Sequence, residues 1–222
     1  MNLRHDRQSK SLGQYLGKEI IERLEEGLAA IDASGERREL AVLFADIRGF
    51  TRFSESSTPE AVFETLNVYL GSMIPAVLDE RGVLDKIIGD EIMAVFGMIP
   101  ADVPAPVLAV RAAKRILSDV SRLNYQRDRK GMPVLFVGAG IATGPVSVGV
   151  LGSDSRKWIT VIGNHVNLAA RLQGQARANQ MVVDSGTLSA LGDHAQGFKE
   201  KVVELKGYST PVTAYLYELP LG

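Results

Sequence analysis

The chain has 222 residues, with 25 Lys and Arg against 26 Asp and Glu, a net charge of −1, and no cysteine. The absence of cysteine excludes disulfides, zinc–thiolate sites and cysteine nucleophiles, and the balanced charge gives no support for a nucleic-acid partner. No apolar stretch approaches the roughly 20 residues that span a bilayer, and the polar start is no secretory signal. We therefore expect a soluble, cytoplasmic protein, or the soluble part of a longer one.

The first predicted element is an amphipathic helix at residues 12–31, where apolar side chains recur at steps of three or four. A polar linker follows it. We therefore divide the chain into an N-terminal helix with its linker, residues 1–35, and a main domain, residues 36–220. The helix is predicted either to pair with its copy in a dimer as a short coiled coil or to pack on its own domain.

The main domain alternates predicted strands and helices. The predicted strands lie at residues 40–47, 83–96 (two strands that turn at Gly89 and Asp90), 134–141, 146–151, 158–162, 180–183, 198–205 and 212–219. The predicted helices begin near Pro59 and span about residues 105–123, 164–178 and 185–191. Because hairpins recur among the alternating elements, the pattern favours an α+β domain with a mixed sheet over a doubly wound parallel one.

Two aspartates end apolar strands in this pattern. Asp46 follows the apolar residues 40–45, and Asp90 lies in the turn after residues 84–88. Burying a carboxylate is costly unless it is paired or bound to a cation. Because Mg²⁺ takes one or two carboxylates together with substrate phosphates, the pair suggests a divalent metal site and phosphoryl or nucleotidyl chemistry. The alternative is that each aspartate is an ordinary turn or cap residue.

Other polar residues stand in apolar surroundings. Lys86 lies inside an apolar strand, where it is either an edge lysine that discourages aggregation or a donor aimed at a ligand. Asn167 and Arg171 share the polar strip of a helix, one turn apart, and a solvated face explains that spacing equally well. The glycines of residues 138–140 lack the strand–turn–helix context of a dinucleotide loop, so close packing or a bulge is the better explanation for them.

Four segments together resemble the signatures of the class III nucleotidyl cyclase catalytic domain, in a bacterial type with threonine at the base-reading position. They are FADIRGFT (44–51), DKIIGD (85–90), TVIGNHVNLAAR (160–171) and LKG (205–207). Their order and spacing agree with that family across about residues 36–220. The resemblance implies a mixed, mostly antiparallel sheet flanked by helices, the ferredoxin-like palm of these cyclases.

The resemblance also implies a reaction, in which the 3′-hydroxyl of a nucleotide attacks its own α-phosphorus and releases pyrophosphate. Asp46 and Asp90, helped by the Ile47 carbonyl, would hold two divalent cations, Mg²⁺ or Mn²⁺. Asn167 would orient the ribose, and Arg171 would neutralise charge on the α-phosphate. In one departure from the pattern, Pro145 stands where some members place an arginine as a phosphate contact, which puts that contact in doubt but not the reaction.

The implied substrate is ATP. Lys86 would donate to adenine N1 and Thr160 would accept from the N6 amino group, whereas guanine presents the reverse pattern. Guanylyl members of the family usually carry an acidic residue at the position of Lys86. Lys206 would contact the terminal phosphates.

The resemblance implies a head-to-tail homodimer with two interfacial sites. One protomer would supply both aspartates, and the other would supply Lys86, Thr160, Asn167 and Arg171. The N-terminal helix would join an upstream sensor domain or membrane region. Two rivals are a diguanylate cyclase, whose Gly-Gly-Asp/Glu-Glu-Phe turn is not present here, and a degenerate regulatory domain, which commonly loses a metal aspartate or the arginine. Every one of those positions is filled in this chain.

Overall fold

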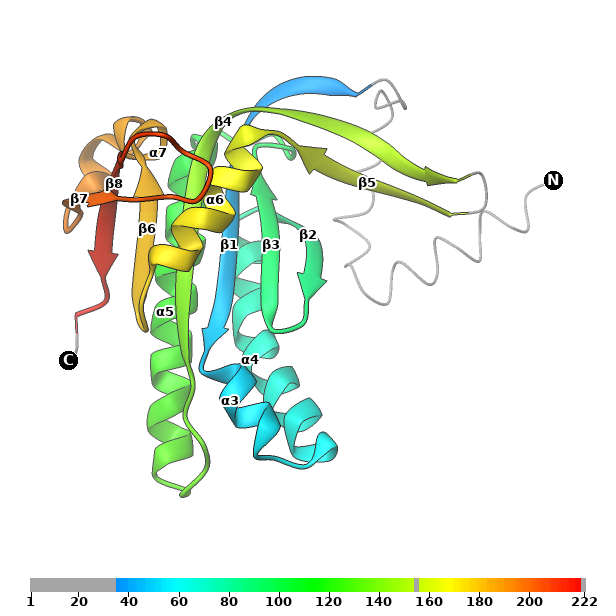
Figure 1. Ribbon diagram of the computed structural model, residues 1–222, viewed down its shortest axis with the longest axis vertical. Coiled ribbons are helices and arrows are strands. Elements are labelled where there is room, and N and C mark those ends of the chain that lie inside the picture. Colours follow the sequence, from blue (N-terminus) through cyan, green and yellow to red (C-terminus); the bar gives the residue numbers. More distant parts are fainter. Residues whose placement is uncertain (1–34, 154–155, 221–222) are drawn as a thin grey trace.

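The computed structural model describes residues 35–153 and 156–220. Within these residues an eight-stranded sheet has the order β2-β3-β1-β4-β6-β8-β7, and β5 pairs with the far part of β4 (Figure 1). The strands are β1 (Glu36–Arg48), β2 (Val83–Ile88), β3 (Glu91–Phe96), β4 (Phe136–Ser153), β5 (Arg156–Ile162), β6 (Gln180–Asp184), β7 (Lys199–Val203) and β8 (Val212–Glu218). The helices are α3 (Phe50–Glu55), α4 (Pro59–Asp79), α5 (Ala105–Asp128), α6 (Asn164–Gln175), α7 (Ser185–Ala190) and the 3₁₀ turn η1 (Gly192–Ala195).

Helices cover both faces of the sheet, with α4 and α5 on one side and α6 on the other (Figure 1). Successive side chains of a strand point to opposite faces, so β1 contributes to two cores. Leu43 and Ile47 pack with α4 and α5. Val42 and Phe44 pack with α6. All the strand pairs are antiparallel except β4 with β6, which confirms the predicted mixed, mostly antiparallel sheet.

Several predicted element boundaries are confirmed. Thr58 caps α4 by accepting a hydrogen bond from the Ala61 amide, and Pro59 occupies the first turn. The two strands predicted within residues 83–96 form a hairpin, and Gly89 takes the left-handed conformation (φ 64°) that its turn requires. The predicted C-terminal hairpin forms between β7 and β8.

Other boundaries differ from the prediction. The strands expected at 134–141 and 146–151 are one continuous strand, β4, in which Pro145 lies opposite Glu39. β4 pairs with β6 up to Ile141 and with β5 from Ser147 onward. Between these two residues it has one neighbouring strand among those described, so one of its edges is open and a proline is tolerated there. Helix α5 runs five residues past the predicted end, α6 ends three residues before its predicted end, and α3 was not predicted.

Helix α4 is, among the described residues, long and apolar enough to cross a membrane by length and composition alone. Glu64 and Asn67 interrupt its apolar sequence, and its buried residues, which include Tyr69 and Met73, belong to the core shared with α5 and the sheet. It is therefore a core helix of this domain. The predicted helix at residues 12–31 lies outside the described residues, and the boundary between residues 1–35 and 36–220 stays a prediction.

Two glycines of β4 let neighbouring groups lie directly on the strand. A side chain at Gly140 would place its Cβ 2.1 Å from the Gln173 backbone nitrogen, so α6 rests on this glycine. A Cβ at Gly138 would lie 2.5 Å from Nε of Arg48. Close packing, as the sequence indicated, therefore explains both glycines, and α6 and Arg48 could not occupy their places over larger residues.

The far part of β4 and β5 form a two-stranded ribbon that projects from the body of the domain (Figure 1). The ribbon and its base expose large apolar side chains, at Leu151 (49%), Trp158 (52%), Ile159 (41%) and Ile162 (56%). A concentration of exposed apolar residues on one element is typical of an interaction surface.

Candidate functional site

The two sequence-predicted metal ligands lie close together. Asp46 is near the end of β1, on the face that carries α6, and pairs in register with Glu91 of β3. Asp90 lies in the β2–β3 turn. Partial burial, followed by the neighbouring Asp46 carboxylate, raises the pKa of Asp90 to about 7. Burial and the Asp46 charge also raise the pKa of Glu91, which Arg48 partly offsets. The end of β1 and the turn therefore concentrate negative charge.

This carboxylate cluster fits a hard divalent cation. Two like charges held together in a half-buried place raise a pKa because each disfavours ionisation of the other, and a bound cation would relieve both. Within the described ranges no group of three or more His, Cys, Asp or Glu side chains could hold a metal, but Mg²⁺ requires only one or two carboxylates beside substrate phosphates. The Ile47 side chain is buried in the core with α4 and α5, so its part in a site would come from the backbone carbonyl.

Arg48 is the cation beside this cluster. It donates to Asp46 Oδ2 at 2.9 Å and also to the backbone carbonyl of Gln173 on α6. The guanidinium thus ties the end of β1 to the helix that crosses it. Arg48 was not among the residues predicted from the sequence, although residues two apart in a strand share a face, and this spacing could have indicated the contact with Asp46.

The two predicted base-reading residues are in direct contact. Lys86 on β2 donates to the Thr160 hydroxyl on β5 at 3.0 Å. Asp85 joins them: Thr160 donates to Asp85 Oδ2 at 3.0 Å, and Lys86 Nζ lies 2.9 Å from the same oxygen. The Asp85 side chain is 5% exposed, whereas that of Lys86 is 42% exposed. The aspartate therefore lies beneath the pair, and the lysine faces outward.

A break in strand register explains how adjacent residues meet one partner. Neighbouring side chains of a regular strand point to opposite faces. The pairing of β2 with β3 shifts between Leu84 and Lys86, so Asp85 is the extra residue of a bulge. Bulges redirect a side chain locally, which lets Asp85 and Lys86 both reach Thr160. The sequence signal for these contacts was a pair of consecutive charged residues in an apolar strand, but the contacts of Asp85 were not predicted.

The predicted transition-state residues lie on α6, and one of them, Arg171, contacts the loop after β7. Asn167 is exposed on the helix. The Arg171 guanidinium lies over the Tyr208 ring, with Cζ 5.2 Å from the ring centroid. A Cβ at Gly207 would be 3.2 Å from a terminal nitrogen of Arg171. Arg171 is thus held against the loop that carries the exposed Lys206, and Tyr208 is a further contact that the sequence analysis missed.

The predicted site residues therefore form three groups within one chain. The carboxylates lie at the end of β1 and in the β2–β3 turn, the base-reading pair joins β2 to β5, and Arg171 packs on the Lys206 loop. In the part of the chain that the structure describes, no side-chain hydrogen bond or ion pair joins Asp46 or Asp90 to Lys86, Thr160, Asn167, Arg171 or Lys206.

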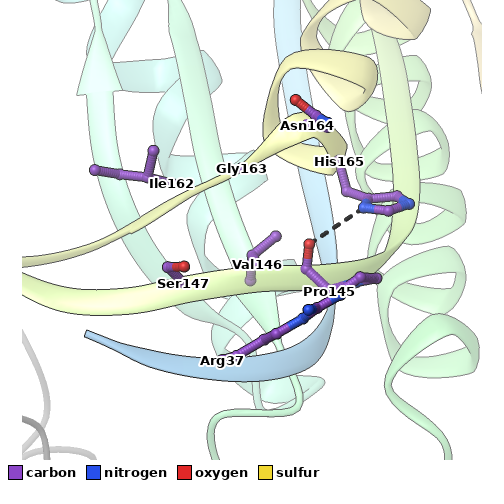
Figure 2. A pocket seen from close by; sticks show the side chains of 8 residues that line it. All are labelled: Arg37, Pro145, Val146, Ser147, Ile162, Gly163, Asn164 and His165. Carbon is purple, nitrogen blue, oxygen red and sulfur yellow. Dashed lines mark hydrogen bonds between the residues drawn. The ribbon is translucent and has the colours of Figure 1, made fainter. Parts of the chain in front are cut away.

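A cavity of about 280 Å³ opens beside Pro145, where the resemblance led us to look for an arginine (Figure 2). Arg37, from the neighbouring strand β1, lines it together with Pro145 (Figure 2). His165 closes one side: its ring packs on Gly144, and Nδ1 lies 3.3 Å from the Pro145 carbonyl. His165 therefore has a packing role here.

Comparison with known proteins gives a consistent result. The model of the adenylate and guanylate cyclase catalytic domain matches residues 33–218. An adenylate cyclase of Anabaena cylindrica is 35% identical over 202 residues, covering 88% of this chain and 38% of that protein. A terminal-differentiation-specific adenylate cyclase of Dictyostelium discoideum is 31% identical over 183 residues, covering 80% of this chain and 8% of that protein. The chain thus spans well under half the length of these curated relatives.

Solved structures agree with the predicted fold. The guanylyl cyclase Cya2 is 34% identical with a TM-score of 0.76, over 82% of this chain and 92% of that one. The adenylyl cyclase CyaB from P. aeruginosa is also 34% identical, with a TM-score of 0.75, over 82% of this chain and 94% of that one. With the family model matched across residues 33–218, these similarities establish that the chain belongs to the adenylate and guanylate cyclase catalytic domain family.

Proposed function

We propose that the chain is an adenylate cyclase domain that converts ATP into 3′,5′-cyclic AMP and pyrophosphate. The observation that carries this proposal is the 3.0 Å contact between Lys86 and Thr160, which sets an ammonium donor beside a hydroxyl. Adenine offers an acceptor at N1 and an amino donor at N6, which this pair complements. Guanine offers N1–H and O6, and a donor facing a donor is strongly disfavoured in a desolvated site.

The proposed reaction requires no covalent enzyme intermediate. The 3′-oxygen forms a bond to the α-phosphorus and loses its proton to solvent, while the bond from the α-phosphorus to the bridging oxygen breaks and releases pyrophosphate. In this reaction Arg171 would meet charge on the α-phosphate, Asn167 would orient the ribose, and Lys206 would contact the terminal phosphates. Divalent cations, Mg²⁺ or Mn²⁺, bound by Asp46, Asp90 and the Ile47 carbonyl would supply positive charge beside the reacting phosphates.

We further propose that the sites are shared across a head-to-tail homodimer. Among the described residues no side-chain hydrogen bond or ion pair joins Asp46 or Asp90 to Arg171 or Lys206, and this supports a site completed by a second copy. Exposed apolar side chains also support it, on β2 at Ile87 (46%) and Ile88 (53%) and along β5. Each dimer would then hold two sites, with the aspartates from one protomer and the base, ribose and α-phosphate contacts from the other.

The same comparisons support a proposal about the larger protein to which the domain belongs. The curated relatives extend well beyond the matched region. This supports a soluble catalytic domain within a longer cytoplasmic or membrane-attached protein, controlled through the segment at residues 12–31 by an upstream sensor domain or membrane region. No nucleic-acid partner is proposed, because the chain carries a net charge of −1.

The test is turnover of the purified protein with ATP or GTP, in the presence of Mg²⁺ or Mn²⁺. We expect 3′,5′-cyclic AMP from ATP and little cyclic GMP from GTP. The similarity to Cya2, as high as that to CyaB, makes guanylate cyclase activity the second candidate. Preferred turnover of GTP would replace the first proposal with the second. No cyclic product from either nucleotide would indicate a regulatory binding module.

A further inference from the structure

Asp85 has no role in the proposed reaction, yet its environment is that of a functional residue. Its side chain is 5% exposed and lies under Lys86 and Thr160, the pair proposed to read the purine. One oxygen, Oδ2, accepts from the Thr160 hydroxyl at 3.0 Å and lies 2.9 Å from Lys86 Nζ. A bulge in β2 places it there, at the cost of regular strand pairing.

The hydrogen-bonding capacity of the three side chains shows what Asp85 does. A threonine hydroxyl has one proton and two acceptor sites, so by itself it can face either a donor or an acceptor. The Asp85 carboxylate takes that proton, and Lys86 occupies one of the two acceptor sites. One acceptor site of Thr160 remains for a ligand. The Lys86 ammonium has three protons, of which Thr160 and Asp85 take two, so one donor remains beside that acceptor.

We propose that Asp85 is a positioning residue that makes the base-reading pair specific for a 6-aminopurine. It does so by fixing the Thr160 hydroxyl proton away from the ligand, which leaves the hydroxyl able only to accept. The O6 of a 6-oxopurine would then face the acceptor site of Thr160, and its N1–H would face the Lys86 ammonium, so both contacts would be mismatched. The inference rests on the proposed function, because it assigns a selectivity to the site that the proposed reaction uses.

A purely structural ion pair is the competing explanation. It would explain the contact of Asp85 with Lys86 but gives no reason for the contact with Thr160, which lies on another strand. A structural role also predicts that kcat/KM falls equally for both nucleotides, because a distorted site would bind and turn over ATP and GTP equally poorly. The ratio of kcat/KM for ATP to kcat/KM for GTP therefore separates the two explanations.

The experiment measures this ratio in the full chain for Asp85→Ala and Asp85→Asn. In Asp85→Ala the hydroxyl proton is free to turn toward the ligand, so we expect the ATP:GTP ratio to fall about tenfold or more. Asp85→Asn keeps an acceptor oxygen of the same shape, and we expect it to hold the ratio within about threefold of the parent chain. Asp79→Ala is the matched control, because Asp79 pairs with Arg115 on the surface at 2.8 Å, and the ratio should not change.

A second background tests whether Asp85 acts through the hydroxyl. Thr160→Val removes the hydroxyl, so adding Asp85→Ala to it should leave the ATP:GTP ratio unchanged, even if both rates fall. Circular dichroism and thermal melting confirm that each variant folds. Three outcomes would overturn the proposal. They are an unchanged ATP:GTP ratio in Asp85→Ala, equal ratios in Asp85→Asn and Asp85→Ala, and a further drop of the ratio in the double variant. Failure of the parent chain to prefer ATP would instead overturn the proposed function.

Discussion

Arg48 donates a hydrogen bond to Asp46 Oδ2 at 2.9 Å from a position two residues further along the same strand. The same guanidinium bonds the backbone carbonyl of Gln173, near the end of α6. One side chain therefore connects a proposed metal ligand with the helix that carries Asn167 and Arg171. In the proposed dimer these elements serve different sites, so Arg48 lies between the two half-sites of one protomer.

Substitution of Arg48 should weaken the metal-dependent activity more than it destabilises the fold. In Arg48→Met the Asp46 carboxylate loses the donor that orients it, and we expect a loss of about 10- to 100-fold in apparent Mg²⁺ affinity or in kcat. Titration of activity with Mg²⁺ and with Mn²⁺ measures this. Arg48→Lys, which keeps the charge without the two-pronged geometry, should recover part of the loss. A metal dependence equal to that of the parent in both variants would contradict a positioning role.

Reversal of the charge at Lys86 should change which nucleotide is used. In Lys86→Glu a carboxylate faces adenine N1, and acceptor against acceptor is unfavourable, so kcat/KM for ATP should fall by about 100-fold or more. The new acceptor complements guanine N1–H, so turnover of GTP should rise relative to ATP. Competition assays with both nucleotides give the ratio directly. Equal use of ATP and GTP by the parent chain would refute the proposed base recognition.

Mixing two inactive variants tests whether sites are shared. Asp46→Ala removes a proposed metal ligand, and Arg171→Ala removes the proposed α-phosphate contact, each with an expected loss of about 100-fold or more in activity. A heterodimer then has one site with both defects and one with neither. If subunits exchange randomly, half the dimers have one of two sites intact, so activity should return to about a quarter of the parent level. A mixture that stays inactive while native mass spectrometry detects heterodimers would rule out shared sites.

Gly140 should tolerate no side chain. Gly140→Ala would place Cβ 2.1 Å from the Gln173 nitrogen and 2.5 Å from the Ala169 carbonyl oxygen, so α6 must shift away from the sheet. We expect a loss of about 2 kcal/mol or more in the free energy of unfolding, measured by urea denaturation. The control is Gly71→Ala in the middle of α4, where a Cβ meets nothing within 4 Å. It should stabilise the protein by about 0.5–1 kcal/mol. Similar effects of the two substitutions would contradict the packing described here.

The crowded carboxylates should make the metal-free protein less stable as pH rises. Burial and Asp46 raise the pKa of Asp90 to about 7, whereas the unfolded chain releases this proton near pH 4, at about the ordinary aspartate value. The contribution of Asp90 to stability is therefore fully present below about pH 4 and is lost as pH rises to about 7.

The measurement is urea unfolding in EDTA at pH 5 and pH 8. Asp90→Asn should gain stability relative to the parent at pH 8, and less at pH 5. Mg²⁺ or Mn²⁺ should raise the melting temperature of the parent more at pH 8 than at pH 5, because a ligand that binds the native state but not the unfolded state stabilises the native state. Asp79→Asn serves as a control for an exposed, ion-paired aspartate. A parent–variant difference that does not grow with pH would refute this expectation.

Local sequence patterns determined most of the elements. The cap at Thr58 with Pro59 at the first helical position fixed where α4 begins, and the turn glycine Gly89 fixed the β2–β3 hairpin. These two predictions are confirmed because caps and turns depend on residues that are neighbours in the chain. The family resemblance rested on motifs in register, and the family match confirmed it. The break predicted at Pro145 was wrong, because whether a strand tolerates proline depends on which neighbours it has at that position.

Only the tertiary structure decided the contacts between distant residues. Asp85 and Thr160 are far apart in the chain, and the β2 bulge that brings them together follows from register with β3, which no local pattern reports. The contact of Arg48 with Gln173 likewise depends on α6 lying over Gly140. The sequence by itself therefore determined which side chains are available for chemistry. The packing of the sheet determined which of them meet, because hydrogen bonds between strands and helices require a geometry that only the assembled layers provide.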